Sequence, residues 1–130
     1  MSKSFLLIGG SSDIGLQLAS LLLGDGHQVT LLARDASRVE TLVSEGAHLV
    51  EGDALDESTV QAAVNHASEQ GENGLSGMAH LVGSIALRPP HATKLEDFES
   101  VLQTNLVSAF LALKTAGKAM LKLGTGRMCF

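Results

Sequence analysis

The chain has 130 residues, of which 45% are hydrophobic and 18% charged, and this composition is typical of one compact α/β domain over residues 1–130 rather than of a disordered segment. Its formal net charge of -5 arises from scattered acidic residues without a basic run, so nucleic acid and anionic membrane surfaces are poor candidates for partners. No apolar run reaches the roughly 18 residues of a membrane-spanning helix, and the single cysteine, which cannot form an internal disulfide, predicts a cytoplasmic location.

A turn of small residues separates the first expected strand from the first expected helix. Residues 5–8 form an unbroken apolar run, which is typical of a parallel strand covered on both faces. After the turn, apolar residues at helical spacing predict a helix that buries Ile14, Leu18, Leu21 and Leu22. Glycines in the turn allow positive φ and close approach of a ligand, while the first N–H groups of the helix stay free. Such a turn binds anions, most often a dinucleotide pyrophosphate, although it can also serve only to pack the strand on the helix.

The spacing of this turn, Gly-x-x-x-Gly-x-Gly between a strand and a helix, resembles the short-chain dehydrogenase/reductase family. Gly9 and Gly15 match the pattern, and Asp13 takes the place of the middle glycine. We interpret Asp13 as a helix cap whose carboxylate faces water, where its repulsion of a phosphate about 4 Å away costs about 1 kcal/mol. The resemblance implies that the cofactor phosphates are bound by Gly9, Ser11, Ser12, Asp13, Ile14 and Gly15.

The second expected strand, residues 27–33, ends where dinucleotide-binding folds discriminate between NAD and NADP. An acid near this point binds the ribose hydroxyls of NAD, whereas an arginine accommodates the 2′-phosphate of NADP. By the resemblance, Ala33 stands where an NAD enzyme carries its acid, and Arg34 follows it. The sequence therefore favours NADP as the cofactor, while the nearby Asp35 leaves NAD as the less favoured alternative. Arg34 could instead be an exposed cation paired with Asp35.

The middle of the chain continues the alternation of helices and strands. Residues 36–44 predict a helix whose apolar side is formed by Val39, Leu42 and Val43, and residues 47–52 predict a third strand. Residues 71–77 form the most loop-like stretch, which we expect to be mobile, and a fourth strand follows over residues 78–82.

Two more segments carry candidate contacts with the nucleotide. Asp53 and Ala54 resemble the start of the family's Asp-x-x-Asp element, which implies that they contact the adenine. Asp53 could equally cap the helix expected over residues 57–70, a role that Asp56 or Ser58 could also take.

The fourth strand ends where the family carries Asn-Asn-Ala-Gly, of which only the glycine matches residues 80–83. The resemblance implies cofactor contacts from Val82, Gly83 and Ser84, while His80 is expected to be a hydrogen-bonded core histidine without a catalytic role. The loop over residues 84–93 follows a strand's carboxyl end, where open α/β sheets place substrates.

A long helix is expected over residues 94–123, with a capping box at Thr93 and Glu96 and a stop at Gly124. Its apolar stripe is Phe98, Val101, Leu102, Ala109, Ala112, Leu113, Ala116 and Met120. Asn105 interrupts the stripe. In the family an Asn in this setting belongs to the catalytic set, while a structural amide that bridges to a neighbouring strand is the alternative. Because residues 106–113 are apolar nearly all round, we expect a homo-oligomer formed through helix 95–123.

Together these segments predict an α/β fold: a three-layer, doubly wound (Rossmann-like) parallel sheet, truncated at about strand five, residues 126–130. The family resemblance implies hydride transfer between NAD(P), here favoured to be NADP, and a small alcohol or carbonyl, with a Ser and a Tyr-x-x-x-Lys pair as the proton path. The chain contains no tyrosine, so we expect an N-terminal fragment that is inactive alone. The alternative is a catalytically inert half-domain that binds a nucleotide or another protein. The histidines and the cysteine show no metal-ligand spacing, and no metal is expected.

Overall fold

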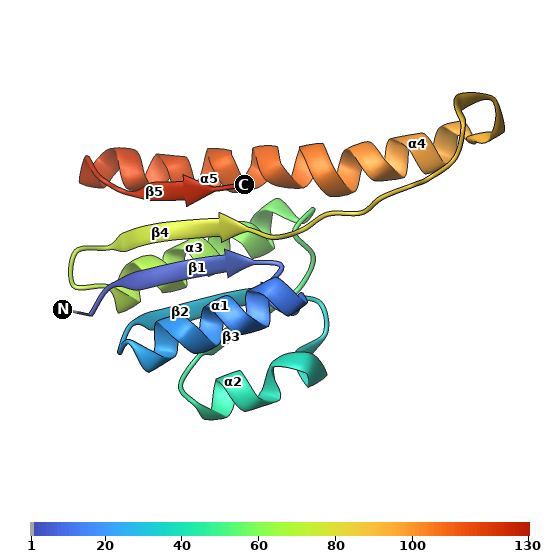
Figure 1. Cartoon of the computed structure of the whole chain (residues 1–130). Helices are drawn as coiled ribbons and strands as arrows, with labels where there is room; N and C mark the ends of the chain where they lie inside the picture. The colour runs from blue at the N-terminus through green and yellow to red at the C-terminus, as the bar shows by residue number, and fades with distance from the viewer. Residues whose placement is uncertain (1) are drawn as a thin grey trace.

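The computed structural model describes residues 2–130, and its centre is a five-stranded parallel sheet (Figure 1). The strands are β1 (Ser4–Ile8), β2 (Gln28–Ala33), β3 (His48–Glu51), β4 (Leu75–His80) and β5 (Arg127–Cys129). Their order in the sheet is β3-β2-β1-β4-β5, and every neighbouring pair runs parallel. Because the carboxyl ends of parallel strands meet at one edge, the loops that follow the first four strands gather there.

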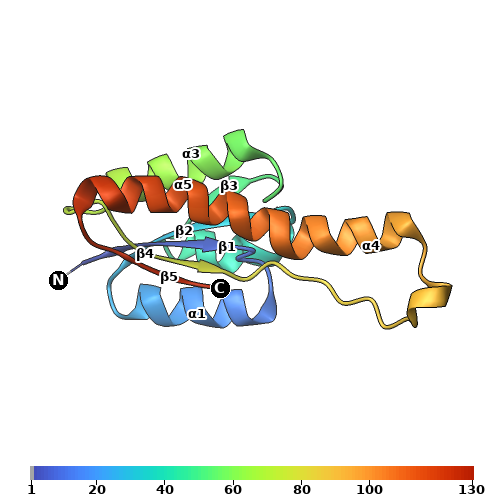
Figure 2. The same ribbon diagram turned by 90° about the horizontal axis from the view of Figure 1, so that it is seen from above.

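Helices cover both faces of the sheet, which confirms the expected three-layer, doubly wound architecture (Figure 2). One face carries α1 (Asp13–Gly24) and the short α2 (Glu40–Ser44), which continues from a 3-10 turn at Ala36–Val39; the other carries α3 (Glu57–Gln70) and α5 (Ser108–Leu123). Successive side chains of β1 point to opposite faces. Leu6 and Ile8 pack with α3 and α5, whereas Leu7 packs with α1 and α2. Cover on both faces therefore explains the unbroken apolar run of β1.

The buried sides of α1 and α2 differ in part from the expected ones. Ile14 and Leu21 are 70% and 69% exposed, whereas Gly15 and Ala19 are buried. A Cβ atom on Gly15 would lie 2.9 Å from a carbonyl oxygen of the preceding turn, so only a glycine permits this close approach. Gly15 and Ala19 consequently face the sheet. Leu18 and Leu22, which were expected to be buried, are only partly buried and pack against the core. Val43 is also exposed, because Val39 and Leu42 make the contacts of this segment with the core.

β4 begins at Leu75, so the prediction of a mobile loop over residues 71–77 is wrong for its second half. The strand also ends at His80 rather than at residue 82. Directly after α3, Gly74 takes a positive φ of +78° and its N–H donates to the carbonyl of Gly71. This tight turn reverses the chain at once, and Leu75 already pairs with Ser4 of β1.

α4 (Leu95–Leu102), a π-helical turn (Gln103–Val107) and α5 form one continuous rod, and the α4 end projects beyond the sheet (Figure 1). The expected capping box is wrong. The Thr93 hydroxyl donates to the carbonyl of Pro89 (2.9 Å) in the preceding segment and not to the helix. The N-cap residue is Lys94, whose side chain makes no capping hydrogen bond. The stop at Gly124 is confirmed by its left-handed φ of +73°.

The apolar stripe expected along this rod is buried only in α5. Ala112, Ala116 and Met120 lie in the core shared with α3, whereas Phe98 of α4 and Leu113 are 53% and 48% exposed. Phe98 is exposed because α4 extends past the sheet edge, as both ribbon views show. Among residues 2–130, no helix has the length and apolar character needed to cross a membrane.

Candidate functional site

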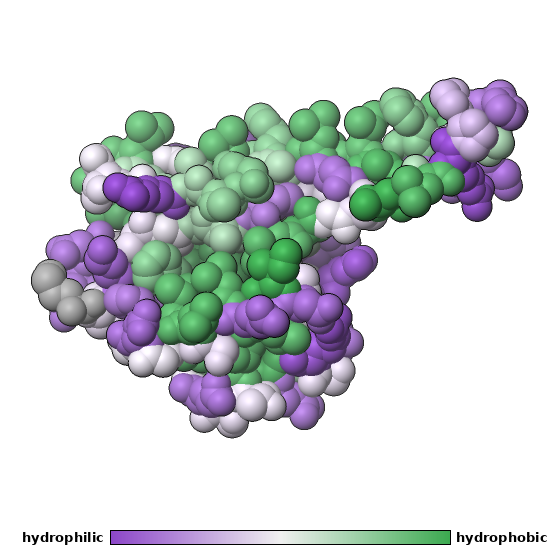
Figure 3. All heavy atoms as spheres, in the orientation of Figure 1, coloured by the Kyte–Doolittle hydropathy of each residue, from purple (hydrophilic) through white to green (hydrophobic). Residues whose placement is uncertain are grey.

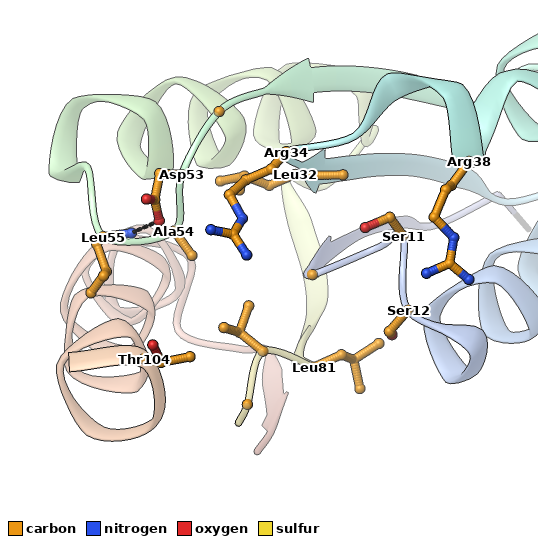
Figure 4. Close-up of a pocket in the computed structure, with 15 residues that line it drawn as sticks. Ser11, Ser12, Leu32, Arg34, Arg38, Asp53, Ala54, Leu55, Leu81 and Thr104 are labelled. Carbon is orange, nitrogen blue, oxygen red and sulfur yellow. Dashed lines mark hydrogen bonds between the residues drawn. The ribbon is translucent and has the colours of Figure 1, made fainter. Parts of the chain in front are cut away.

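A cavity of about 380 Å³ opens at the carboxyl edge of the sheet. It is lined by the turn after β1, by the end of β2 and the 3-10 turn that follows, by residues 52–55 after β3, by residues 81–83 after β4, and by Thr104 of the π-helical turn. Figure 4 shows these segments around one hollow, with the guanidinium group of Arg34 pointing into it. The cavity therefore collects side chains from five separate parts of the chain.

Gly9 shapes the floor of the cavity. Its φ is +85°, and a Cβ atom there would lie 2.9 Å from the carbonyl carbon of Leu81 and from a methyl carbon of Val82. Both its N–H and that of Gly10 donate to the carbonyl of Leu32, at 2.9 and 3.2 Å. The turn is thereby tied to β2 and pressed against the segment after β4, a position that only glycine can occupy without strain.

The helix cap after this turn is Ser12 and not Asp13. The Ser12 hydroxyl accepts a hydrogen bond from the Gly15 N–H at 3.1 Å, because an N-cap side chain reaches the third helical residue. Asp13 is the first residue of α1. Its carboxylate is 91% exposed and lies 2.9 Å from the guanidinium of Arg38. The expectation that this charge faces water is therefore correct, although its role as a cap is not.

The turn retains backbone donors that suit an anion. Within residues 2–130, the hydrogen bonds at the turn account for the N–H groups of Gly9, Gly10, Ser12 and Gly15, and they leave those of Ser11, Asp13 and Ile14 without an acceptor. Free N–H groups at a helix N-terminus, together with the helix dipole, favour a phosphate. The donor set and the close-packed Gly9 thus fit the diphosphate of a dinucleotide.

Two arginines and no carboxylate line the cavity at the end of β2. Arg34 directly follows the strand, and Arg38 comes from the 3-10 turn. The Asp35 carboxylate instead accepts hydrogen bonds from the hydroxyl and the N–H of Ser37; the hydroxyl bond is the largest cause of its lowered pKa. Of the ion pairs among residues 2–130, none includes Arg34, so the alternative of an Arg34–Asp35 pair is wrong.

The loop after β3 places Asp53 at the cavity. Its carboxylate accepts a hydrogen bond from the Leu55 N–H at 2.9 Å, which folds the loop locally. The cap of α3 is Asp56, which accepts from the N–H of Ser58 at 3.0 Å. The hydroxyl of the same serine is the largest cause of the lowered pKa of Asp56. Asp53 is therefore not the helix cap, and it lines the cavity together with Ala54 and Leu55.

Asn105 fastens the segment after β4 to the rod. Its side-chain oxygen accepts from the Ser84 N–H at 3.0 Å, and its amide nitrogen donates to the carbonyls of Ser84 and Val101, both at 2.9 Å. The amide thus bridges from the rod to the loop after β4, whereas the structural alternative expected a bridge to a strand. Ser84 and Asn105 lie beside the cavity rather than in its lining, whereas Val82 and Gly83 line it.

The sequence matches the short chain dehydrogenase family over residues 3–130. The chain belongs to that family.

Relatives within the short chain dehydrogenases match nearly the whole chain but only part of themselves. The 3-oxoacyl-[acyl-carrier-protein] reductase MabA of Mycobacterium tuberculosis is 30% identical, over 100% of this chain and 50% of its own length. The D-threitol dehydrogenase of Mycolicibacterium smegmatis is 31% identical, over 95% of this chain and 50% of its own length. The chain therefore spans about half the length of the curated relatives it matches.

Solved structures of the family agree with the fold. A short-chain type dehydrogenase/reductase from Mycobacterium marinum superimposes with a TM-score of 0.86 at 22% identity, covering 97% of this chain and 53% of that one. A structure of actinorhodin polyketide ketoreductase with NADPH also gives 0.86, at 27% identity, covering 98% and 51%.

The cavity holds most of the residues that the family resemblance predicted, and several that it missed. The predicted residues in its lining are Gly9, Ser11, Ser12, Arg34, Asp53, Ala54, Val82 and Gly83. Asp13, Ile14 and Gly15 form the first turn of the adjoining helix. The predicted site residues did not include Leu32, Ala33, Arg38, Gly52, Leu55, Leu81 and Thr104, which also line the cavity. Of these residues, only Arg38 could have been predicted from the sequence, because it is a second arginine four residues after Arg34.

Proposed function

We propose that this chain binds NADP in the cavity at the carboxyl edge of the sheet, as the cofactor-binding half of a short-chain oxidoreductase. The observation that carries the proposal is the turn between β1 and α1, whose free N–H groups adjoin a cavity that also receives two arginines. When bound, the nicotinamide cofactor supplies or accepts the hydride. The residues described above bind and orient it.

In this proposal each part of the cavity recognises one part of the nucleotide. The N–H groups of Ser11, Asp13 and Ile14 bind the diphosphate at the positive end of α1. Asp53 and Ala54 contact the adenine, on the opposite side of the hollow from Ser11 and Ser12 (Figure 4). Val82, Gly83 and Ser84 form the remaining cofactor contacts.

The preference for NADP over NAD rests on charge at the end of β2. A 2′-phosphate needs a cation, and ribose hydroxyls need a carboxylate acceptor. Arg34 and Arg38 line the cavity at this point, while Asp35 is engaged with Ser37 and Ala33 has no polar side chain. The solved ketoreductase with NADPH lends this choice further support.

Catalysis is proposed only for a longer protein. The family's Tyr-x-x-x-Lys pair is absent from this chain because the sequence has no tyrosine, and a missing general acid typically costs about 10²- to 10⁴-fold in rate. Asn105 is proposed as the one member of the family's catalytic set present here. A small alcohol or carbonyl substrate and a cytoplasmic location belong to the same proposal, and an inert half-domain is the less favoured alternative.

Self-association through the α4–α5 rod, residues 95–123, is part of the proposal. Along the rod Leu106 and Phe110 are 63% and 58% exposed, and Figure 3 shows hydrophobic atoms along its outer side. Exposed apolar surface of this extent is costly in water unless a partner covers it. A second copy of the chain is the partner we propose.

Calorimetric titration with NADP and NAD tests the cofactor proposal. We expect NADP to bind more tightly than NAD. Arg34→Ala should weaken NADP binding about tenfold, since an exposed cation contributes about 1–2 kcal/mol beside a phosphate. NAD binding should stay unchanged. Arg127→Ala is the matched control because Arg127 begins β5, at the opposite edge of the sheet. Tighter binding of NAD, or no binding of either nucleotide, would contradict the proposal.

A further inference from the structure

His80 links the central sheet to the π-helical turn beside the cavity. It is the last residue of β4 and only 7% exposed. Its Nε2 atom lies 2.9 Å from the hydroxyl oxygen of Ser108, the first residue of α5. The Ser108 hydroxyl in turn hydrogen bonds with the carbonyl of Thr104, one turn earlier. A chain of two hydrogen bonds therefore runs from β4 to a residue that lines the cavity.

Ser108 makes the π-helical turn (the wide turn, residues 103–107) possible. In a regular α-helix its N–H would donate to Thr104, four residues earlier; here it donates to Gln103, five residues earlier. The Thr104 carbonyl would then lose its usual partner, and the Ser108 hydroxyl supplies one. Single π-helical turns inside α-helices are frequently found at functional sites. This one carries Thr104, which faces the cavity, and Asn105, which holds Ser84.

The hydrogen bonds decide the protonation of the imidazole. A carbonyl can only accept, so the single proton of the Ser108 hydroxyl is donated to Thr104. The Nε2 atom of His80 must therefore carry a proton and donate it to the Ser108 oxygen. Burial also lowers the pKa of His80, which favours the neutral form of the ring.

We propose that His80 is a positioning residue of the nucleotide site, which acts by donating its Nε2 proton to Ser108 and so holds the wide turn that presents Thr104 and Asn105. This inference rests on the proposed nucleotide-binding function. It differs from the role of Arg34, because the turn adjoins the part of the cavity that NADP and NAD share. Loss of the His80 donor therefore weakens the binding of NADP and of NAD by the same factor.

Three variants test this role by calorimetry at a temperature where circular dichroism shows each to be folded. His80→Leu removes the donor and should weaken NADP and NAD alike, by about tenfold. His80→Gln keeps an amide N–H near the Nε2 position and should restore binding to within about threefold of the original. His27→Leu is the matched control: this half-buried imidazole accepts from the Lys3 N–H at the opposite end of the sheet, and only the melting temperature should change.

Nucleotide affinity of His80→Leu equal to that of the original chain would overturn the inference. Nitrogen-15 spectra of the unaltered protein give a second, independent readout: we expect the Nε2–H form of His80, and an Nδ1–H form would overturn the inference. If the unaltered chain binds neither nucleotide, the proposed function fails. The tautomer, together with the amide shifts of residues 103–108 in His80→Leu, then still decides whether His80 holds the turn, and unchanged shifts would refute it.

Discussion

The carboxylate of Asp13 stands beside the proposed phosphate site, and its removal is an informative perturbation. Asp13→Asn keeps the size of the side chain and removes its charge. In the structure this charge is 91% exposed and lies 2.9 Å from Arg38, one of the two arginines at the cavity. The substitution therefore removes a negative charge near the phosphates and at the same time releases a cation.

The expected gain follows from Coulomb's law. Two unit charges about 4 Å apart interact by about 1 kcal/mol in water, and the exposure of Asp13 places it near this limit. Since 1.4 kcal/mol is a factor of ten, we expect NADP to bind about fivefold more tightly to Asp13→Asn. Stability should fall slightly, because an acid in the first helical turn typically contributes about 0.3–1 kcal/mol.

Calorimetric titration at low salt and at about 0.1 M salt measures this effect. The gain should shrink at the higher salt, where the screening length is about 10 Å. Asp25→Asn is the control, because Asp25 lies at the opposite end of α1 and should leave affinity unchanged. Weaker binding by Asp13→Asn would refute the reasoning, since it would mean that the carboxylate is needed to position Arg38 for the ligand.

Three further predictions concern stability and assembly. Gly9→Ala should lower the melting temperature by several degrees and abolish nucleotide binding. The left-handed backbone costs an alanine about 1–2 kcal/mol, and the Cβ atom of the alanine would collide with the segment after β4. Gly24→Ala is the control and should be tolerated, because the space around Gly24 is free. Burial and then a stacked neighbouring imidazole lower the pKa of His66, so the unfolded chain binds more protons and urea titrations should show stability falling as the pH drops below about 6.5. His66→Gln should reduce this dependence, and an unchanged slope would contradict the assignment. Light scattering after size exclusion should show an oligomer that Phe110→Asp dissociates and that Leu21→Asp, on α1, does not; a monomeric original chain would contradict the proposed interface.

Features that depend on a few neighbouring residues were predicted well. The apolar run of β1, the turn that begins at Gly9 and the stop at Gly124 all have local physical causes: cover on both faces, and backbone angles that favour glycine. Arg34 and Asp53, which were predicted to contact the cofactor, both line the cavity for a related reason. Arg34 directly follows β2 and Asp53 lies two residues after the end of β3, and the carboxyl ends of parallel strands meet at one edge.

Features that depend on packing between distant segments were predicted poorly. Equal helical spacing could not show that α1 buries Gly15 rather than Ile14, since that depends on how closely the helix approaches the turn. Nor could the sequence show whether Ser12 or Asp13 caps α1, because both are good capping residues and only the backbone geometry decides between them.

The sequence alone determined the fold class and the candidate phosphate-binding turn, because apolar periodicity and glycine positions are properties of short segments. Only the tertiary structure brought Thr104 and Arg38 into the same cavity as that turn, and only it joined His80 to Ser108 across 28 residues. The reason is that such contacts arise from the order and spacing of the strands in the sheet, which no single segment specifies.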